Sequence, residues 1–186
     1  MKSIRFLALA VTTAALLAVF AGGAASSRTK PQLLYATGGV TGLSGGASSM
    51  DELIQRFVTA LEHRDRDALD ALRVTESEYR NWIVPGSVEP GEKPQILKED
   101  ASAYFWGTLN GKTIYTREAL LSSYGGRHLE VMSHTFRKGT KTYANFVSHG
   151  RLELVVRDEQ GEEAQLRTGS IAEVDGRFKF ISFICD

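Results

Sequence analysis

A single cysteine, Cys185, is present among the 186 residues. An intramolecular disulfide is therefore excluded, and the fold must depend on its hydrophobic core alone. A lone thiol can pair with a second chain, but a half-buried cysteine at the end of a strand is the simpler interpretation.

Catalytic and metal-binding patterns are scarce as well. Nucleophilic hydrolysis has no support, because Cys185 has no plausible partner and we expect no serine on a nucleophile elbow. No run of histidine, cysteine and acidic residues has finger-like spacing. The glycine-rich stretch 38–46 follows no strand pattern, so it is not a phosphate-binding loop. We predict no metal and no cofactor.

Charge of one sign is also lacking, since 22 Lys and Arg balance 22 Asp and Glu. Removal of the first 25 residues would take away Lys2 and Arg5 but no acid, which leaves 20 basic against 22 acidic residues, a net charge of −2. This balance gives no electrostatic reason to bind nucleic acid or an anionic membrane. We predict neither as a partner.

The longest apolar run, residues 6–20, is shorter than the roughly 20 residues that a membrane span needs. It follows Lys2 and Arg5 and is followed by small residues, which is typical of a secretory signal peptide. We predict cleavage after Ala25, no stable membrane insertion afterwards, and a periplasmic or extracellular location. Residues 26–48, rich in Gly, Ser and Thr, indicate a flexible linker, and residues 49–186 have the length of one domain.

Helix signals occupy the first part of this domain. Ser49 and Glu52 have the spacing of a capping box, and Thr75 and Glu78 repeat it. Between them, Asp65 predicts the cap of a short second helix. Apolar residues follow the first box at helical spacing: Met50, Leu53, Ile54, Phe57 and Leu61. We also predict helices over 99–109 and from Thr116 to Tyr124, separated by a turn at Asn110-Gly111.

Strand signals occupy the C-terminal part. Leu152, Leu154 and Val156 alternate with Glu153, Val155 and Arg157, the period of two of a half-buried strand. Strands over 164–174 and 177–185 flank Asp175-Gly176, a pair that favours a tight hairpin turn. That turn would place Phe180 opposite Ile171. Helices first and strands last predict an α+β fold with helices packed on an antiparallel sheet.

Large apolar groups occupy both faces of the predicted final hairpin. The turn register would also place Phe183 opposite Thr168, on the face away from Phe180 and Ile171. An antiparallel sheet usually has one wet face. We therefore expect helices to cover one face and a partner or a long segment to cover the other, with a homodimer through the sheet as one option.

This order of elements resembles the NTF2-like (SnoaL-like, cystatin-like α+β) superfamily. The run Asp175-Gly176-Arg177-Phe178-Lys179-Phe180 is similar to the last hairpin of such domains. The resemblance implies a cone in which a curved sheet wraps a pocket, and dimerisation through the outer sheet face. Enzymes of the superfamily, such as ketosteroid isomerases and scytalone dehydratases, place acids, histidine and tyrosine inside the cone, but no motif transfers those residues to this chain.

Two histidines in the strand region, His134 and His149, are weak candidates for a general base. A histidine satisfied by backbone at a strand end is the alternative, and the sequence favours it because no spacing ties an acid to either ring. His63 and His128 fall at helix ends or loops and are expected in solvent.

Aromatic residues in the helices could line an apolar pocket for a small ligand. Packing in the core is the competing interpretation, because aromatic side chains dominate core burial. The candidate ligand-binding residues are Tyr79, Trp82, Tyr104, Trp106 and His149.

Three classes of function remain open. The first is an exported module that binds a small apolar ligand or assists another protein. The second is a cofactor-independent lyase or isomerase that uses His134 or His149 as its base. The third is a structural dimer module that binds an envelope partner.

Overall fold

The computed structural model describes residues 42–185. The predicted signal peptide and most of the predicted linker lie outside the described residues. None of the helices within 42–185 combines the length and apolarity that a membrane crossing requires. The helices are α1 (Met50–Glu62), α2 (Arg66–Ala71), α3 (Glu76–Glu78), the π-helical turn η1 (Tyr79–Ile83), α4 (Val84–Gly86) and α5 (Glu99–Tyr124).

The helix starts follow the predicted caps with one difference. The Ser49 hydroxyl accepts from the Glu52 backbone N–H, but the Glu52 carboxylate bonds the backbone and hydroxyl of Ser48 instead of closing the box on Ser49. The second box, between Thr75 and Glu78, is complete in both directions. The Asp65 carboxylate accepts from the Ala68 N–H and caps α2 as expected.

Helix α5 continues without a break through Asn110 and Gly111, so the predicted turn between two shorter helices is wrong. Glycine in a helix interior costs about 1 kcal/mol relative to alanine. Burial of Thr113, Leu120 and Leu121 against the rest of the fold offsets this cost. Tertiary packing therefore overrides the local turn signal.

The strands are β1 (Leu129–Phe136), β2 (Thr140–Thr142), β3 (Val147–His149), β4 (Leu152–Asp158), β5 (Glu163–Arg167), β6 (Ile171–Val174) and β7 (Arg177–Phe180). They form antiparallel sheets ordered β1-β4-β5 and β2-β3-β6-β7. The predicted strand 164–174 is interrupted at 168–170. Leu152 at the start of β4 nevertheless donates to the Gly169 carbonyl and accepts from Thr168, so hydrogen bonds hold the connecting segment between β5 and β6 against β4. The α+β fold class is confirmed.

The last hairpin is predicted in register but not in length. Asp175 and Gly176 adopt φ values of 48° and 74°, and Phe180 pairs with Ile171, as expected. The strand ends at Phe180, however, and Cys185 is exposed rather than half-buried. Phe183 does not continue the ladder opposite Thr168. It is fully buried, and its ring contacts those of Phe57 and Phe180 at 5.6 and 5.2 Å.

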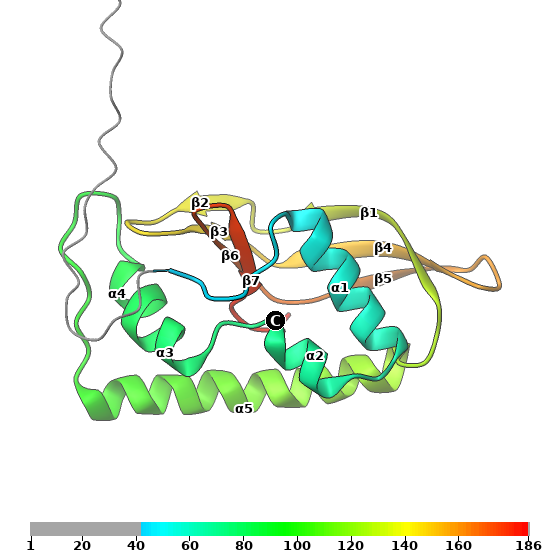
Figure 1. The fold of residues 1–186 in the computed structure, drawn as a ribbon, viewed down its shortest axis with the longest axis horizontal. Helices are drawn as coiled ribbons and strands as arrows, with labels where there is room; N and C mark the ends of the chain where they lie inside the picture. Colours follow the sequence, from blue (N-terminus) through cyan, green and yellow to red (C-terminus); the bar gives the residue numbers. More distant parts are fainter. Residues whose placement is uncertain (1–41, 186) are drawn as a thin grey trace, which may run out of the picture. The chain divides into compact units, whose positions relative to one another are not determined.

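Helices of the same chain cover both apolar faces of the four-stranded sheet. Helix α1 contacts β1, β7 and α5, and its buried face shares one core with Ile171 and Phe180. Figure 1 shows α2 lying between the strands and α5, with α1 crossing in front of β4 and β5 and ending near α5. Ala172 and Val174, on the other face, pack against Val74 and Ile83 in a second core. The expected cover by a partner or long segment is therefore not required on this sheet.

Two segments outside the named strands protect the outer edge of β7. Ala47 exchanges two backbone hydrogen bonds with Phe178, and Phe180 does the same with the segment 72–74. Leu43 is buried in the second core. Residues 42–48, assigned to the linker by composition, therefore belong to the folded domain.

Candidate functional site

Three strands bring His149 together with an acid and a hydroxyl. Thr140 on β2 is the ladder partner of His149 on β3, and Glu173 lies one pleat along the neighbouring β6 on the same face. The His149 Nε2 atom is 2.8 Å from Glu173 Oε2, and its Nδ1 atom is 3.2 Å from Thr140 Oγ1. The imidazole is largely buried, with 14 % of the side chain exposed against 33 % for Glu173.

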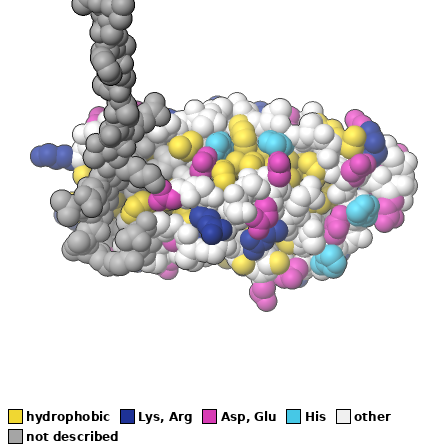
Figure 2. Space-filling view, turned by 45° about the horizontal axis from the view of Figure 1, so that its top comes forward, with side chains coloured by type: hydrophobic (Ala, Val, Ile, Leu, Met, Phe, Trp, Pro, Cys, Tyr) yellow, Lys and Arg dark blue, Asp and Glu magenta, His cyan; other side chains and the backbone are white. Residues whose placement is uncertain are grey.

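Aromatic rings surround this histidine and connect it to the second one. The Phe136 ring lies 5.0 Å from His149 and 5.8 Å from His134, and the Phe178 ring lies 6.2 Å from His149. Figure 2 shows two histidine side chains on either side of a group of hydrophobic side chains. The two candidate histidines thus flank the same phenylalanine, with His134 exposed at the outer end.

The hydrogen bonds determine the tautomer of His149. An ionised carboxylate only accepts hydrogen bonds, so in a neutral imidazole Nε2 carries the proton and donates a hydrogen bond to Glu173. The lone pair of Nδ1 then accepts from the Thr140 hydroxyl. A substrate that displaced this hydroxyl would meet a basic nitrogen held in place by a carboxylate. Sequence spacing could not reveal Glu173, because it is 24 residues from His149 and reaches it only through the pairing of β3 with β6.

The five aromatic and histidine residues proposed as a ligand site do not form one group. Tyr79 and Trp106 meet between η1 and α5 at 5.5 Å, and burial raises the pKa of Tyr79. Trp82 packs against the second core, where its indole N–H has no hydrogen-bond partner among residues 42–185. Tyr104 is 70 % exposed on α5, and His149 lies on the sheet. Tyr79 and Trp106 are therefore the only pair of the five in ring contact within these residues.

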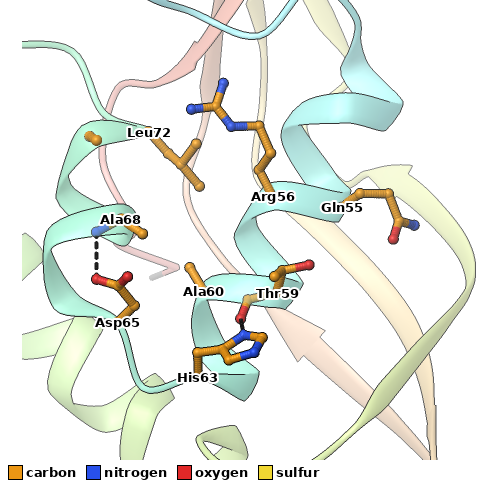
Figure 3. Close-up of a pocket in the computed structure, with 9 residues that line it drawn as sticks. Gln55, Arg56, Thr59, Ala60, His63, Asp65, Ala68 and Leu72 are labelled. Carbon is orange, nitrogen blue, oxygen red and sulfur yellow. Dashed lines mark hydrogen bonds between the residues drawn. The ribbon is translucent and has the colours of Figure 1, made fainter.

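A groove of about 360 Å³ lies between α1 and α2 (Figure 3). Its apolar lining residues are Ala60, Ala68, Ala71 and Leu72, and its polar ones are Gln55, Arg56, Thr59, His63 and Asp65. A volume above 300 Å³ and a mainly apolar lining are typical of small-molecule sites. No sequence pattern indicates this groove, because alanines on one helix become a cavity floor only when a second helix lies beside them.

The polar groups of the groove differ in how far they are already engaged. Asp65 is held by its bond to the Ala68 N–H, and the His63 Nδ1 atom lies 2.8 Å from the Thr59 carbonyl. Arg56 makes one long contact, 3.7 Å, with Glu52 outside the groove. Figure 3 shows Arg56 near Leu72 at one end and His63 near Asp65 at the other. A ligand would thus find an apolar floor with an available cation at its edge.

Glu78 and Lys179 form a buried ion pair that sequence analysis missed. The Lys179 ammonium lies 2.9 Å from Glu78 Oε2, and both side chains are at most 4 % exposed. The carboxylate also accepts from the backbone N–H groups of Ser44 and Thr75. Burial alone would raise the pKa of Glu78, but bonds from Thr75, Lys179 and Ser44 outweigh it and hold the pKa below its usual value. Both charges are compensated, so this pair is structural.

Ser44 lies in a run, Gly42 to Gly46, that has the G-x-S-x-G spacing, contrary to our expectation that no serine would occupy an elbow sequence. The described part of this run is not a strand-to-helix turn. The Ser44 hydroxyl donates to Glu78, and Glu78 is already bound to Lys179. This serine has the spacing of an elbow without its structure.

Metal ligands are not grouped within residues 42–185, where no three histidine, cysteine or acidic side chains could hold an ion together. Comparison of the chain with protein-family models, curated proteins and solved structures finds no match. The candidate sites therefore depend on the geometry of the chain itself: the α1–α2 groove and the histidine row on the sheet.

Proposed function

We propose that this chain is an exported NTF2-like module that binds a small apolar molecule in the α1–α2 groove. The groove carries the proposal, because its volume of about 360 Å³ and its alanine and leucine floor suit a ligand of that kind. The order of helices and antiparallel strands supports the NTF2-like assignment, and the basic, apolar and small residues of 1–25 support export.

The rim of the groove favours a carboxylate on the ligand. Asp65, the acid in the lining, is engaged in capping α2, whereas the Arg56 guanidinium has, among residues 42–185, only a long contact with Glu52. A hydrogen bond to a charged group contributes about 1.5–3 kcal/mol, or roughly tenfold or more in affinity. An apolar chain with a terminal carboxylate would use both the floor and Arg56.

Calorimetric titration with octanoate and with 1-octanol tests this proposal. We expect octanoate to bind more tightly, and Arg56→Gln to reduce octanoate affinity by about tenfold while leaving octanol unchanged. Two variants that fill the groove, Ala68→Phe and Thr59→Phe, should abolish binding of both. Ala119→Phe, at an exposed position of α5, is the matched control and should bind normally.

Saturable binding that survives both groove-filling variants would place the ligand elsewhere. Absence of octanoate and octanol binding to the folded wild-type protein would contradict the proposal. Thermal unfolding followed by circular dichroism shows which variants are folded, so a loss of binding is not confused with a loss of structure.

Proton transfer by His149 is a second candidate function, favoured by its contacts with Glu173 and Thr140. A carboxylate that orients a histidine is the arrangement of a general base. The probe is acetylacetone, a weak carbon acid whose exchange with D2O is followed by NMR. The candidate requires exchange faster than an equal concentration of imidazole gives, and loss of the excess in His149→Gln. Equal rates in wild type and His149→Gln would exclude it.

A further inference from the structure

Helix α5 exposes large apolar side chains that the described chain leaves uncovered. Tyr104 and Tyr115 are 70 % and 79 % exposed, and Ile114 is 40 % exposed. Phe105, 48 % exposed, supports the Tyr104 ring with an edge contact at 5.9 Å. Figure 1 shows α5 along one edge of the described domain, on the far side of α1 and α2 from the strands. Tyr104, Ile114 and Tyr115 lie on one face of the helix, whereas Phe105 flanks it, and exposed apolar groups gathered on one face indicate an interaction surface.

Two glycines lie between the exposed tyrosines on the same face. A Cβ atom at Gly107 or Gly111 would meet nothing within 4 Å, so no packing inside the described chain requires glycine there. Each glycine in a helix interior costs about 1 kcal/mol relative to alanine. A second backbone that approached α5 closely from outside would explain both residues.

We infer that α5 is the contact surface for a second copy of this chain, with two α5 helices packed antiparallel across Gly107 and Gly111. The spacing is self-complementary. The midpoint of the two glycines is Leu109, and the midpoint of Tyr104 and Ile114 is the same residue. A two-fold axis at the level of Leu109, on the opposite, exposed side of the helix, would therefore place Gly107 of one copy against Gly111 of its partner, and Tyr104 against Ile114.

The same symmetry pairs a small residue with the most exposed tyrosine. Ala103 and Tyr115 are also centred on Leu109, so the ring of one copy would lie over the methyl group of the other. Large side chains thus meet small or apolar ones at each step along the contact. Such alternation is what close packing of two helices requires.

The available area suits this contact. At about 200 Å² for a fully exposed aromatic side chain, Tyr104 and Tyr115 alone offer roughly 300 Å² per copy. The whole 26-residue helix is about 39 Å long, so two copies can bury on the order of the 1,000 Å² that a specific interface needs.

Light scattering on the mature chain measures the expected dimer. Gly111→Arg should give a monomer, because the long side chain occupies the space of the second backbone, and the monomer should remain folded because the position is open. Tyr104→Glu should weaken the dimer as well. Ser123→Arg, an exposed site on another side of α5, is the control and should stay dimeric.

Disulfide cross-linking in a Cys185→Ser background tests the arrangement. A mixture of the Tyr104→Cys and Ile114→Cys chains should cross-link faster than either chain alone. Faster linking of Tyr104→Cys to itself would indicate parallel helices and overturn the proposal. A wild-type chain that stays monomeric at millimolar concentration would also overturn the proposal. The occupant of α5 would then be something other than a second copy, such as another protein. This inference does not depend on the groove, since octanoate binding and subunit number are measured separately.

Discussion

At the scale of single residues, the helix cap at Glu78 was predictable but its burial was not. The Thr75–Glu78 box follows from four consecutive residues. Lys179 lies 101 residues further on and reaches the same carboxylate only because β7 packs beside α3. Local sequence patterns reveal hydrogen bonds within one turn of helix, whereas ion pairs between distant elements can be identified only from the folded structure.

Replacing Glu78 by Gln should lower the free energy of unfolding by about 3–5 kcal/mol, because Lys179 would be left buried without an opposite charge. Urea unfolding at pH 7 measures this loss. The double variant Glu78→Gln with Lys179→Met should lose less, because it leaves no buried charge unpaired and the amide oxygen can still accept a backbone hydrogen bond. Equal losses in the single and double variants would contradict a coupled buried pair.

The same residue predicts an acid dependence. Folding lowers the pKa of Glu78, so the stability that it contributes is complete above the unfolded value of about 4.3. This contribution falls as the pH drops through the folded-state pKa. Wild type should therefore lose more stability than Glu78→Gln when urea midpoints are compared between pH 5 and pH 2. If the urea midpoints of wild type and Glu78→Gln fell in parallel with pH, the pKa of Glu78 would be the same in the folded and unfolded chain.

His149 allows a direct spectroscopic check of the histidine row. When neutral, its ring should carry the proton on Nε2, because Glu173 can only accept a hydrogen bond. Nitrogen-15 chemical shifts of the imidazole distinguish the two tautomers. In Glu173→Gln the preference should weaken, since the amide can also donate. A proton on Nδ1 in the wild type would contradict the geometry on which the second candidate function depends.

At the scale of elements, periodicity predicted helices and strands well where one side of the element is buried. Helix α1 has a single apolar stripe, and the Asp175-Gly176 turn needs positive φ values that few residue pairs supply. Helix α5 lacks such a stripe, because only a few scattered positions are buried. The exposed pair Asn110-Gly111 within it was therefore predicted as a turn.

The final hairpin offers a quantitative test of turn chemistry. Gly176 has a φ of 74°, so Gly176→Ala should lower the free energy of unfolding by about 1–2 kcal/mol. Gly176→Asn should cost less, because asparagine tolerates the left-handed region. Denaturant unfolding compares the two. Equal stability of the alanine variant and the wild type would contradict the turn geometry.

At the scale of the whole molecule, the sequence predicted the α+β class but not the surfaces where helices meet. The histidine row follows from strand pairing, and the groove follows from the placement of α2 beside α1. Neither arrangement leaves a spacing signal in the chain. Cover of both sheet faces by the chain's own helices also removes the reason for dimerising through the four-stranded sheet, and directs attention to α5.

Native mass spectrometry of the protein purified from the exported fraction tests the central claim, that the chain carries a small molecule in the α1–α2 groove. We expect a mass above that of the chain beginning at Ser26, and the excess mass should disappear on denaturation. It should also be absent from the folded Ala68→Phe and Thr59→Phe variants. A bare wild-type chain that also fails to take up added octanoate would contradict it.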